Sequence, residues 1–250
     1  MLSAFADVSL LQLLLVAGVA LVASLVGGVA GYGTGALMPL ILVPMLGAEA
    51  VVPILAMSAL LTNASRVFAF LRLVSWRRAA LVLAGAVPPC LFSAYGFTLL
   101  TGTGAQLLIG GMLMLTVPLR MTLKRRAVAL GDRGLVLGSA GYGAAVGGTV
   151  GAGVILLSLL MAAGLQGAAV IATDAAVSVV IGLARIAVFG LAGVIGMKTV
   201  AYALLIGLIA FPGVFLARAF VMRLPIQVHT AILDTVVLIG GAVMIYGALR

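Results

Sequence analysis

Two arginines that stand in apolar stretches are the first candidates for chemistry. Arg66 begins the segment Arg66-Val-Phe-Ala-Phe70, and Arg185 begins the matching segment Arg185-Ile-Ala-Val-Phe189. If these stretches cross a bilayer, each charge costs about 2.5–3.5 kcal/mol on insertion scales, so it usually has a partner or a function. A guanidinium group offers a planar fork of donors that suits an oxyanion. The two segments match, which is typical of a duplicated chain whose halves are related by a pseudo-symmetry axis. The pair therefore indicates an anion site where both side chains converge near that axis. The alternative is that one or both snorkel to the interface.

Polar residues precede Arg66 at helical spacing. Thr62 and Asn63 lie four and three residues before it, and Ser58 lies eight residues before it. Residues three and four apart share a helix face. Thr62 and Asn63 are therefore predicted to bind the same anion.

Glycine clusters mark the middle of two unusually long apolar segments. One cluster includes Gly31, Gly33 and Gly35, and the other includes Gly151 and Gly153. Glycine lowers helix stability by about 1 kcal/mol relative to alanine, so these clusters predict helix breaks. Backbone N–H groups at such a break carry partial positive charge and can bind an anion. Close helix packing through small residues is the alternative.

Three further residues could carry protons and are therefore candidates for ion coupling. Asp174 precedes Arg185 by eleven residues, or about 16 Å of helix, so the two do not pair directly. Asp234 lies in the last apolar segment, where a contact that ties helices together is the alternative. His229 lies one turn earlier, near the expected helix end, where an interfacial role is favoured.

Nothing in the sequence suggests an enzyme, a metal site or a cofactor. Cys90 is the only cysteine and His229 the only histidine, and no carboxylate pair or Ser/His pair has catalytic spacing. We expect no catalytic residue, no bound metal and no cofactor.

The composition is that of a membrane protein. Of 250 residues, 65% are hydrophobic and 8% charged, with a mean hydropathy of +1.39, whereas soluble domains carry about 25% charged residues. A crossing helix needs roughly 20 apolar residues. The chain thus predicts an all-α polytopic fold of about eight helical segments, at 10–46, 50–71, 79–99, 104–122, 134–163, 168–190, 198–221 and 226–249.

The net charge of +9 fits membrane topology better than nucleic-acid binding. The basic residues cluster in short gaps between apolar runs, as in Arg72 to Arg78 and Arg120 to Arg133. Short cytoplasmic loops collect lysine and arginine in this way. The expected partners are membrane lipid and a small anion, with no nucleic acid. The sequence leaves the oligomeric state open, a homo-oligomer included.

The segments recur in the same order in both halves of the chain. Leu108-Ile-Gly-Gly-Met-Leu-Met114 returns as Leu238-Ile-Gly-Gly-Ala-Val-Met244, and Pro89-Cys-Leu-Phe92 returns as Pro212-Gly-Val-Phe215. These matches predict two four-segment repeats, 1–126 and 127–250, in one membrane domain. If each long segment crosses once, the repeats are parallel, and if each is a re-entrant hairpin, they are inverted. Counting basic residues on the two sides does not decide. Inverted repeats are favoured because they accompany midplane helix breaks in secondary transporters.

The glycine-rich motifs resemble the TauE/SafE family of sulfite and sulfonate exporters, also called the TSUP family. The resemblance rests on Gly31-Tyr-Gly-Thr-Gly-Ala-Leu-Met-Pro39 with Pro44 following, on an Ala/Ser-rich helix with Ser58 and Asn63, and on Gly147-Gly-Thr-Val-Gly-Ala-Gly-Val-Ile155. It covers nearly the whole chain. It implies transport of sulfite, taurine, sulfoacetate or a related sulfur anion, coupled to an ion gradient, in a prokaryotic inner membrane.

The expected function is therefore secondary transport of a small organosulfur anion by alternating access. The alternative is an anion-selective channel, which needs a continuous pore with stacked cationic rings, and two arginines with a duplicated helix break fit alternating access better. The sequence leaves open which anion moves, in which direction and with which coupling ion.

Overall fold

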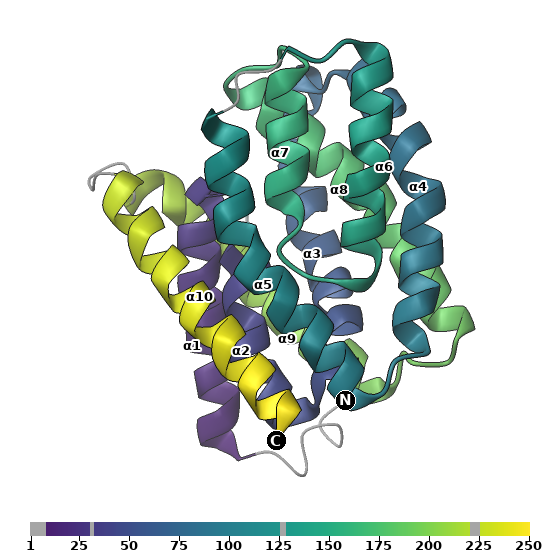
Figure 1. Ribbon diagram of the computed structural model, residues 1–250. Coiled ribbons are helices and arrows are strands. Elements are labelled where there is room, and N and C mark those ends of the chain that lie inside the picture. Colours follow the sequence, from purple (N-terminus) through teal and green to yellow (C-terminus); the bar gives the residue numbers. More distant parts are fainter. Residues whose placement is uncertain (1–8, 31–32, 126–128, 221–225) are drawn as a thin grey trace.

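The computed structural model describes residues 9–30, 33–125, 129–220 and 226–250. Over these residues the chain forms ten α-helices, one short 3₁₀-helix and no strand (Figure 1). The helices are α1 (Leu10–Ala30), α2 (Gly33–Leu46), α3 (Ala48–Phe70), η2 (Leu71–Leu73), α4 (Trp76–Thr98), α5 (Gly102–Arg125), α6 (Asp132–Gly148), α7 (Gly153–Ala162), α8 (Ala168–Leu191), α9 (Met197–Phe220) and α10 (Ile226–Leu249).

Several of these helices suit a bilayer by length and composition. Among the described residues, four apolar stretches are long enough to cross: Ala48–Phe68, Trp76–Thr98, Gly102–Leu119 and Ala168–Leu191. Large apolar side chains also face outward, with Phe68, Phe92 and Leu191 at least 80% exposed. Apolar side chains in these positions are favourable where they contact the hydrocarbon tails of lipids. The chain is thus an all-α polytopic membrane protein, as its composition predicted.

Both long apolar segments break where the glycines cluster, which confirms that prediction. The first is divided between α1 and α2, and the second between α6 and α7. After α6, the backbone of Thr149 is extended, and Gly151 has a φ of 84°. Only glycine adopts that left-handed conformation without strain.

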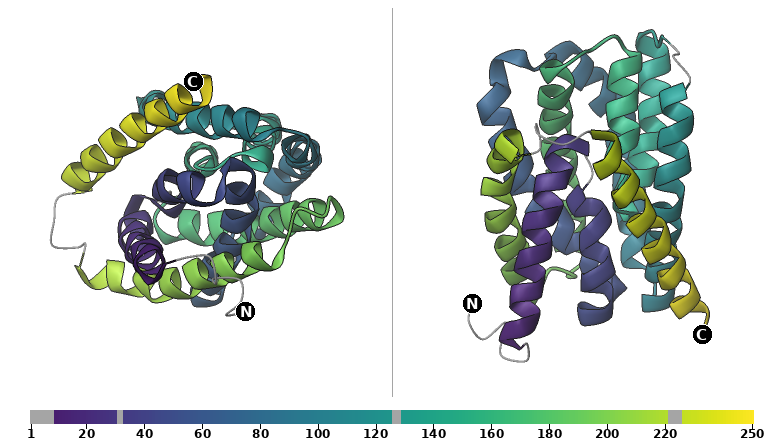
Figure 2. Two further views of the ribbon diagram at one scale, coloured as in Figure 1. Left: turned by 90° about the horizontal axis from the view of Figure 1, so that it is seen from below. Right: turned by 90° about the vertical axis from the view of Figure 1, so that its left-hand side faces the viewer.

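The two broken segments are re-entrant hairpins that enter from opposite ends of the molecule. The backbone N–H of Leu130, just before α6, donates to the carbonyl of Ala162 at the end of α7, at 2.8 Å. The base of this hairpin therefore lies at one end of the molecule and its tip in the middle (Figure 1). The hairpin of α1 and α2 opens at the other end (Figure 2). This is the arrangement that inverted repeats require.

Each hairpin packs on a crossing helix from the other half of the chain. The α6 helix lies along α4, and α1 lies along α9. The α4–α6 contact is close because of glycine: a Cβ on Gly143 would overlap the carbonyl of Ala86, and one on Gly147 would overlap the carbonyl of Cys90. These two glycines serve close packing, which was the alternative reading of the clusters.

Several further helix contacts are also related in pairs. Contacts of α3 with α9 correspond to those of α8 with α4, and contacts of α5 with α7 correspond to those of α10 with α2. When the two halves of the chain are exchanged, the α3–α8 contact maps onto itself, and so does the α5–α10 contact. A duplicated unit related by a two-fold axis would give this pattern. The predicted boundary between 126 and 127 lies outside the described residues.

One end of the α4–α6 pair also carries an ionic contact. Asp132, the first residue of α6, accepts hydrogen bonds from Arg77 and Arg78 of α4, each at 2.6 Å. These ion pairs therefore link the start of α4 to the base of the second hairpin.

Candidate anion site

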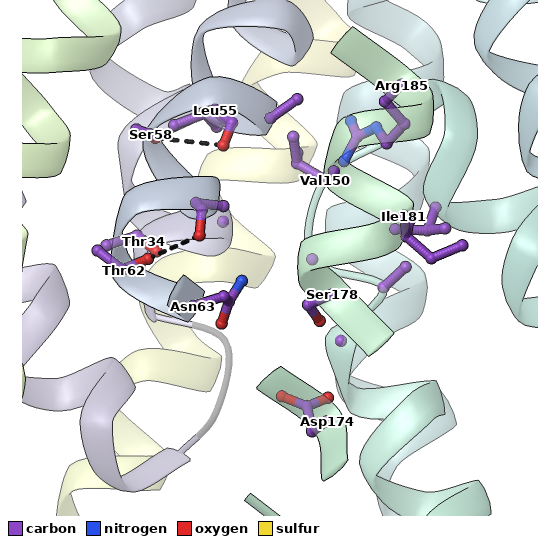
Figure 3. Close-up of a pocket in the computed structure, with 18 of the residues that line it drawn as sticks. Thr34, Leu55, Ser58, Thr62, Asn63, Val150, Asp174, Ser178, Ile181 and Arg185 are labelled. Atoms are coloured by element: carbon purple, nitrogen blue, oxygen red, sulfur yellow. Dashed lines mark hydrogen bonds between the residues drawn. The ribbon is translucent and has the colours of Figure 1, made fainter. Parts of the chain in front are cut away.

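A cavity of about 150 Å³ lies between the two hairpin tips and the crossing helices α3 and α8 (Figure 3). About 10–15 Å³ of such volume suffices for one water molecule, so the cavity has room for several. Its polar and charged lining residues are Ser24, Thr34, Ser58, Thr62, Asn63, Arg66, Tyr142, Thr149, Asp174, Ser178 and Arg185. The size and lining suit a small polar ligand.

The two hairpin tips touch beside this cavity. A Cβ added to Gly35, in the first turn of α2, would lie 3.2 Å from the backbone nitrogen of Gly151. Gly151 belongs to the break between α6 and α7 and lines the cavity with Gly35 and Gly153. The glycines therefore let the first turn of α2 approach the break between α6 and α7 closely.

Arg185 connects α8 to the second tip. Its Nη2 donates to the carbonyl oxygen of Thr149 at 3.1 Å, and its guanidinium carbon lies 5.9 Å from the ring centre of Phe189. The residue is only 8% exposed, and its buried Nε has no hydrogen-bond partner. An unpaired buried donor costs about 1–3 kcal/mol. The Arg185 Nε–H is therefore a buried donor left without a partner among the described residues.

Asp174 lies on the same helix at the other end of the cavity (Figure 3). It is 6% exposed, and its Oδ1 has no hydrogen-bond partner. The preceding residue, Thr173, accepts a hydrogen bond from the backbone N–H of Ser75 at 3.0 Å. This end of the cavity therefore adjoins the turn before α4.

The two arginines line one cavity but do not converge at one point. Arg66 lies at the Asp174 end, where the two charges act on each other. Arg185 is eleven residues from Asp174, which is about 16 Å along α8. The structure therefore differs from the predicted convergence: the cationic groups approach the cavity from opposite ends. Inverted repeats would give this arrangement, since they would send equivalent residues to opposite ends of a shared site.

Helices α3 and α8 contribute equivalent positions to the lining. Four pairs of lining residues have the same spacing along the chain as Arg66 and Arg185. They are Leu55 and Asp174, Ala59 and Ser178, Thr62 and Ile181, and Asn63 and Gly182. Because Leu55 takes the place of Asp174, the carboxylate is present in only one half. The lining positions of α3 and α8 are thus equivalent, but only α8 carries a carboxylate.

Most residues predicted for the site line the cavity. These are Thr62, Asn63, Arg66, Arg185, Gly35, Gly151, Gly153 and Asp174. Gly33 is the first residue of α2, and Gly31 and the side chain of His229 lie outside the described residues. Asp234 lies in α10 and is not among the lining residues.

Sequence reasoning missed several polar lining residues. Ser178 stands four residues after Asp174, so the helical face of Asp174 and Arg185 could have revealed it. Figure 3 shows Ser178 facing Asn63 across the cavity. Ser24 and Thr34 line the cavity because the first hairpin folds back, and the sequence carries no signal for their position.

The arrangement resembles an anion cradle more than a catalytic centre. Ser58 and Thr62 donate their hydroxyl protons to carbonyls of their own helix, Leu55 at 3.2 Å and Ala59 at 3.1 Å. Two guanidinium groups, an amide and the glycine backbone remain to receive an oxyanion.

Comparison with known proteins gives one match. The family model for the sulfite exporter TauE/SafE matches residues 16–244. No curated protein and no solved structure matched the chain. The matched region contains all of the cavity lining, the second hairpin and the first hairpin from residue 16 onward. The chain therefore belongs to the TauE/SafE sulfite exporter family, a family of membrane transporters.

Proposed function

We propose that this protein moves a small organosulfur anion, such as sulfite, taurine, sulfoacetate or another sulfonate, across the inner membrane by alternating access. The proposal includes coupling to an ion gradient. The observation that supports it best is the cavity between the two re-entrant tips, with Arg66 and Arg185 in its lining.

Arg185 is the strongest candidate for direct substrate contact. One of its nitrogens is already held by Thr149, which fixes the plane of the guanidinium group. The part of the guanidinium group that lines the cavity is then held in place to receive an oxyanion. Such charge-assisted bonds are about twice as strong as neutral ones. A sulfonate or sulfite oxygen is a suitable acceptor.

The hairpin tips are the candidate moving parts. Secondary transporters bind substrate near the membrane midplane, where broken helices meet, and move one repeat against the other. Here the tips meet at Gly35 and Gly151, next to the cavity. Separation of the tips would open the cavity toward one side or the other. A channel would instead need a continuous pore with rings of like charge.

The test is uptake into proteoliposomes of sulfite, taurine, sulfoacetate and chloride, with and without a pH gradient. Saturable uptake of a sulfur anion but not of chloride would support the proposal, and rapid unsaturable chloride flux would favour a channel. Arg66→Ala and Arg185→Ala test the site itself. Arg77→Ala is the matched control, because the Arg77 side chain is 76% exposed and outside the cavity. Normal transport by both cavity variants would refute the placement of the site.

A further inference from the structure

The carboxylate of Asp174 has no role in holding an anion. It lines the same cavity as Arg66 and Arg185, yet a negative charge there repels the substrate. Its position in the other half is taken by Leu55, so the fold does not require a carboxylate. A buried ionised group without good partners is costly to retain. Asp174 therefore needs an explanation beyond packing.

The surroundings of Asp174 leave it poorly paired. Among the described residues it makes no salt bridge within 4.0 Å, and its Oδ1 is buried without a partner. The charged or titratable groups that act on it are Arg66 of α3 and Tyr142 of α6. The cavity residues from α7 and α9, Gly153 and Ala210, carry no charge.

Arg66 is thus shared between two negative groups. In the empty cavity its charge is balanced in part by Asp174. When an anion enters, two negative groups compete for the same guanidinium in a low-dielectric space. Addition of a proton to Asp174 removes that competition and frees Arg66 for the substrate.

We infer that Asp174 is the proton-binding group of this transporter, and that one proton bound to its carboxylate accompanies each anion through the cavity. This rests on the proposed function and names its coupling ion. The step is balanced: a proton from water adds to the Asp174 carboxylate, the anion binds to the freed arginines, and both leave on the other side. For a singly charged anion, the cycle moves no net charge.

The experiment uses the full-length protein in proteoliposomes that contain a pH-sensitive dye. Taurine, a zwitterion without net charge, and sulfoacetate, a dianion, are the probes, because neither changes its charge between mildly acidic and neutral buffer, whereas sulfite does. Valinomycin and equal potassium concentrations on both sides hold the membrane potential at zero, so the proton gradient alone sets the accumulation. A tenfold inward proton gradient should drive up to about tenfold accumulation of the carried anion by wild type. The dye should report acidification that follows anion entry.

The decisive variant is Asp174→Asn, which copies the shape of the protonated carboxyl. We expect it to carry the anion to equal concentrations on both sides, with no accumulation and no acidification of the lumen. Asp174→Glu should restore both the accumulation of the anion and the acidification of the lumen. It keeps the test decisive if the asparagine variant fails to fold. Asp234→Asn is the matched control, since Asp234 lies in an apolar helix but outside the cavity lining. It should accumulate the anion like wild type.

The outcomes separate this inference from the proposed function. If wild type carries neither anion, the proposed function fails for sulfonates and the inference falls with it. If wild type carries an anion without moving protons, only the inference is wrong. If Asp174→Asn still accumulates the anion with the wild-type proton ratio, Asp174 is a structural partner of Arg66 and nothing more.

Discussion

Gly35 and Gly151 bring the two re-entrant hairpins into contact, with only 3.2 Å between an added Gly35 Cβ and the Gly151 nitrogen. The hairpins belong to different halves of the chain and enter from opposite ends. Their meeting point is beside the cavity, so a small displacement there changes the shape of the site.

Gly35→Ala should slow transport severalfold without unfolding the protein. The new methyl group meets the backbone of Gly151, which cannot move aside as a flexible side chain would. Overpacking of this kind costs about 1–3 kcal/mol. Uptake into proteoliposomes measures the effect. Gly18→Ala in α1 is the control, because an added Cβ there meets nothing within 4 Å. Equal rates for both variants would show that the tip contact is unimportant.

Gly143→Ala should destabilise the protein by at least about 1–3 kcal/mol, because the methyl group overlaps the carbonyl of Ala86. The helices α4 and α6 would have to separate. Thermal denaturation in detergent measures the change. Gly141→Ala lies on the same helix with nothing within 4 Å, so it should be neutral or slightly stabilising. If the two variants unfold at the same temperature, α4 and α6 do not pack as closely as described.

Arg185→Lys should impair transport although it keeps the charge. Lysine has no planar fork, so it cannot hold the Thr149 carbonyl and an oxyanion in one fixed geometry. A hydrogen bond to a charged group contributes about 1.5–3 kcal/mol, so we expect the substrate KM to rise about 10- to 100-fold. Concentration-dependent uptake measures this. The exposed Arg77→Lys should behave like wild type. An unchanged KM in Arg185→Lys would mean that only the positive charge matters.

Asp132→Asn should change stability by less than about 1 kcal/mol. The carboxylate contacts Arg77 and Arg78, but its side chain is 41% exposed and Arg77 is 76% exposed. Exposed ion pairs contribute about 0–1 kcal/mol, because water and salt screen them. Thermal denaturation at low and high salt measures this. A larger loss that disappears at high salt would indicate that the three charges act as a network.

The sequence predicted those features of the fold that depend on composition and local conformation. Apolar runs gave the crossing helices, and the glycine clusters gave the breaks before Gly33 and after Gly148. The side from which each broken segment enters was not determined, because counts of basic residues were equally compatible with both topologies. That property depends on tertiary contacts such as the one between Leu130 and Ala162.

For the candidate site, too, the sequence predicted which residues take part but not how they are arranged. Arg66, Arg185, Asn63 and Asp174 were found because charged and polar residues are rare in these helices. Their arrangement was not found, since it follows from the antiparallel relation of α3 and α8. Ser24 could not be found at all, because its place in the lining depends on how the first hairpin folds back.

The exchange of hairpins between the halves also limits how the chain can be divided. A fragment made of either half would leave its hairpin without the α4 or α9 helix on which it packs. The first hairpin therefore meets its α9 partner only after most of the chain has been made and inserted.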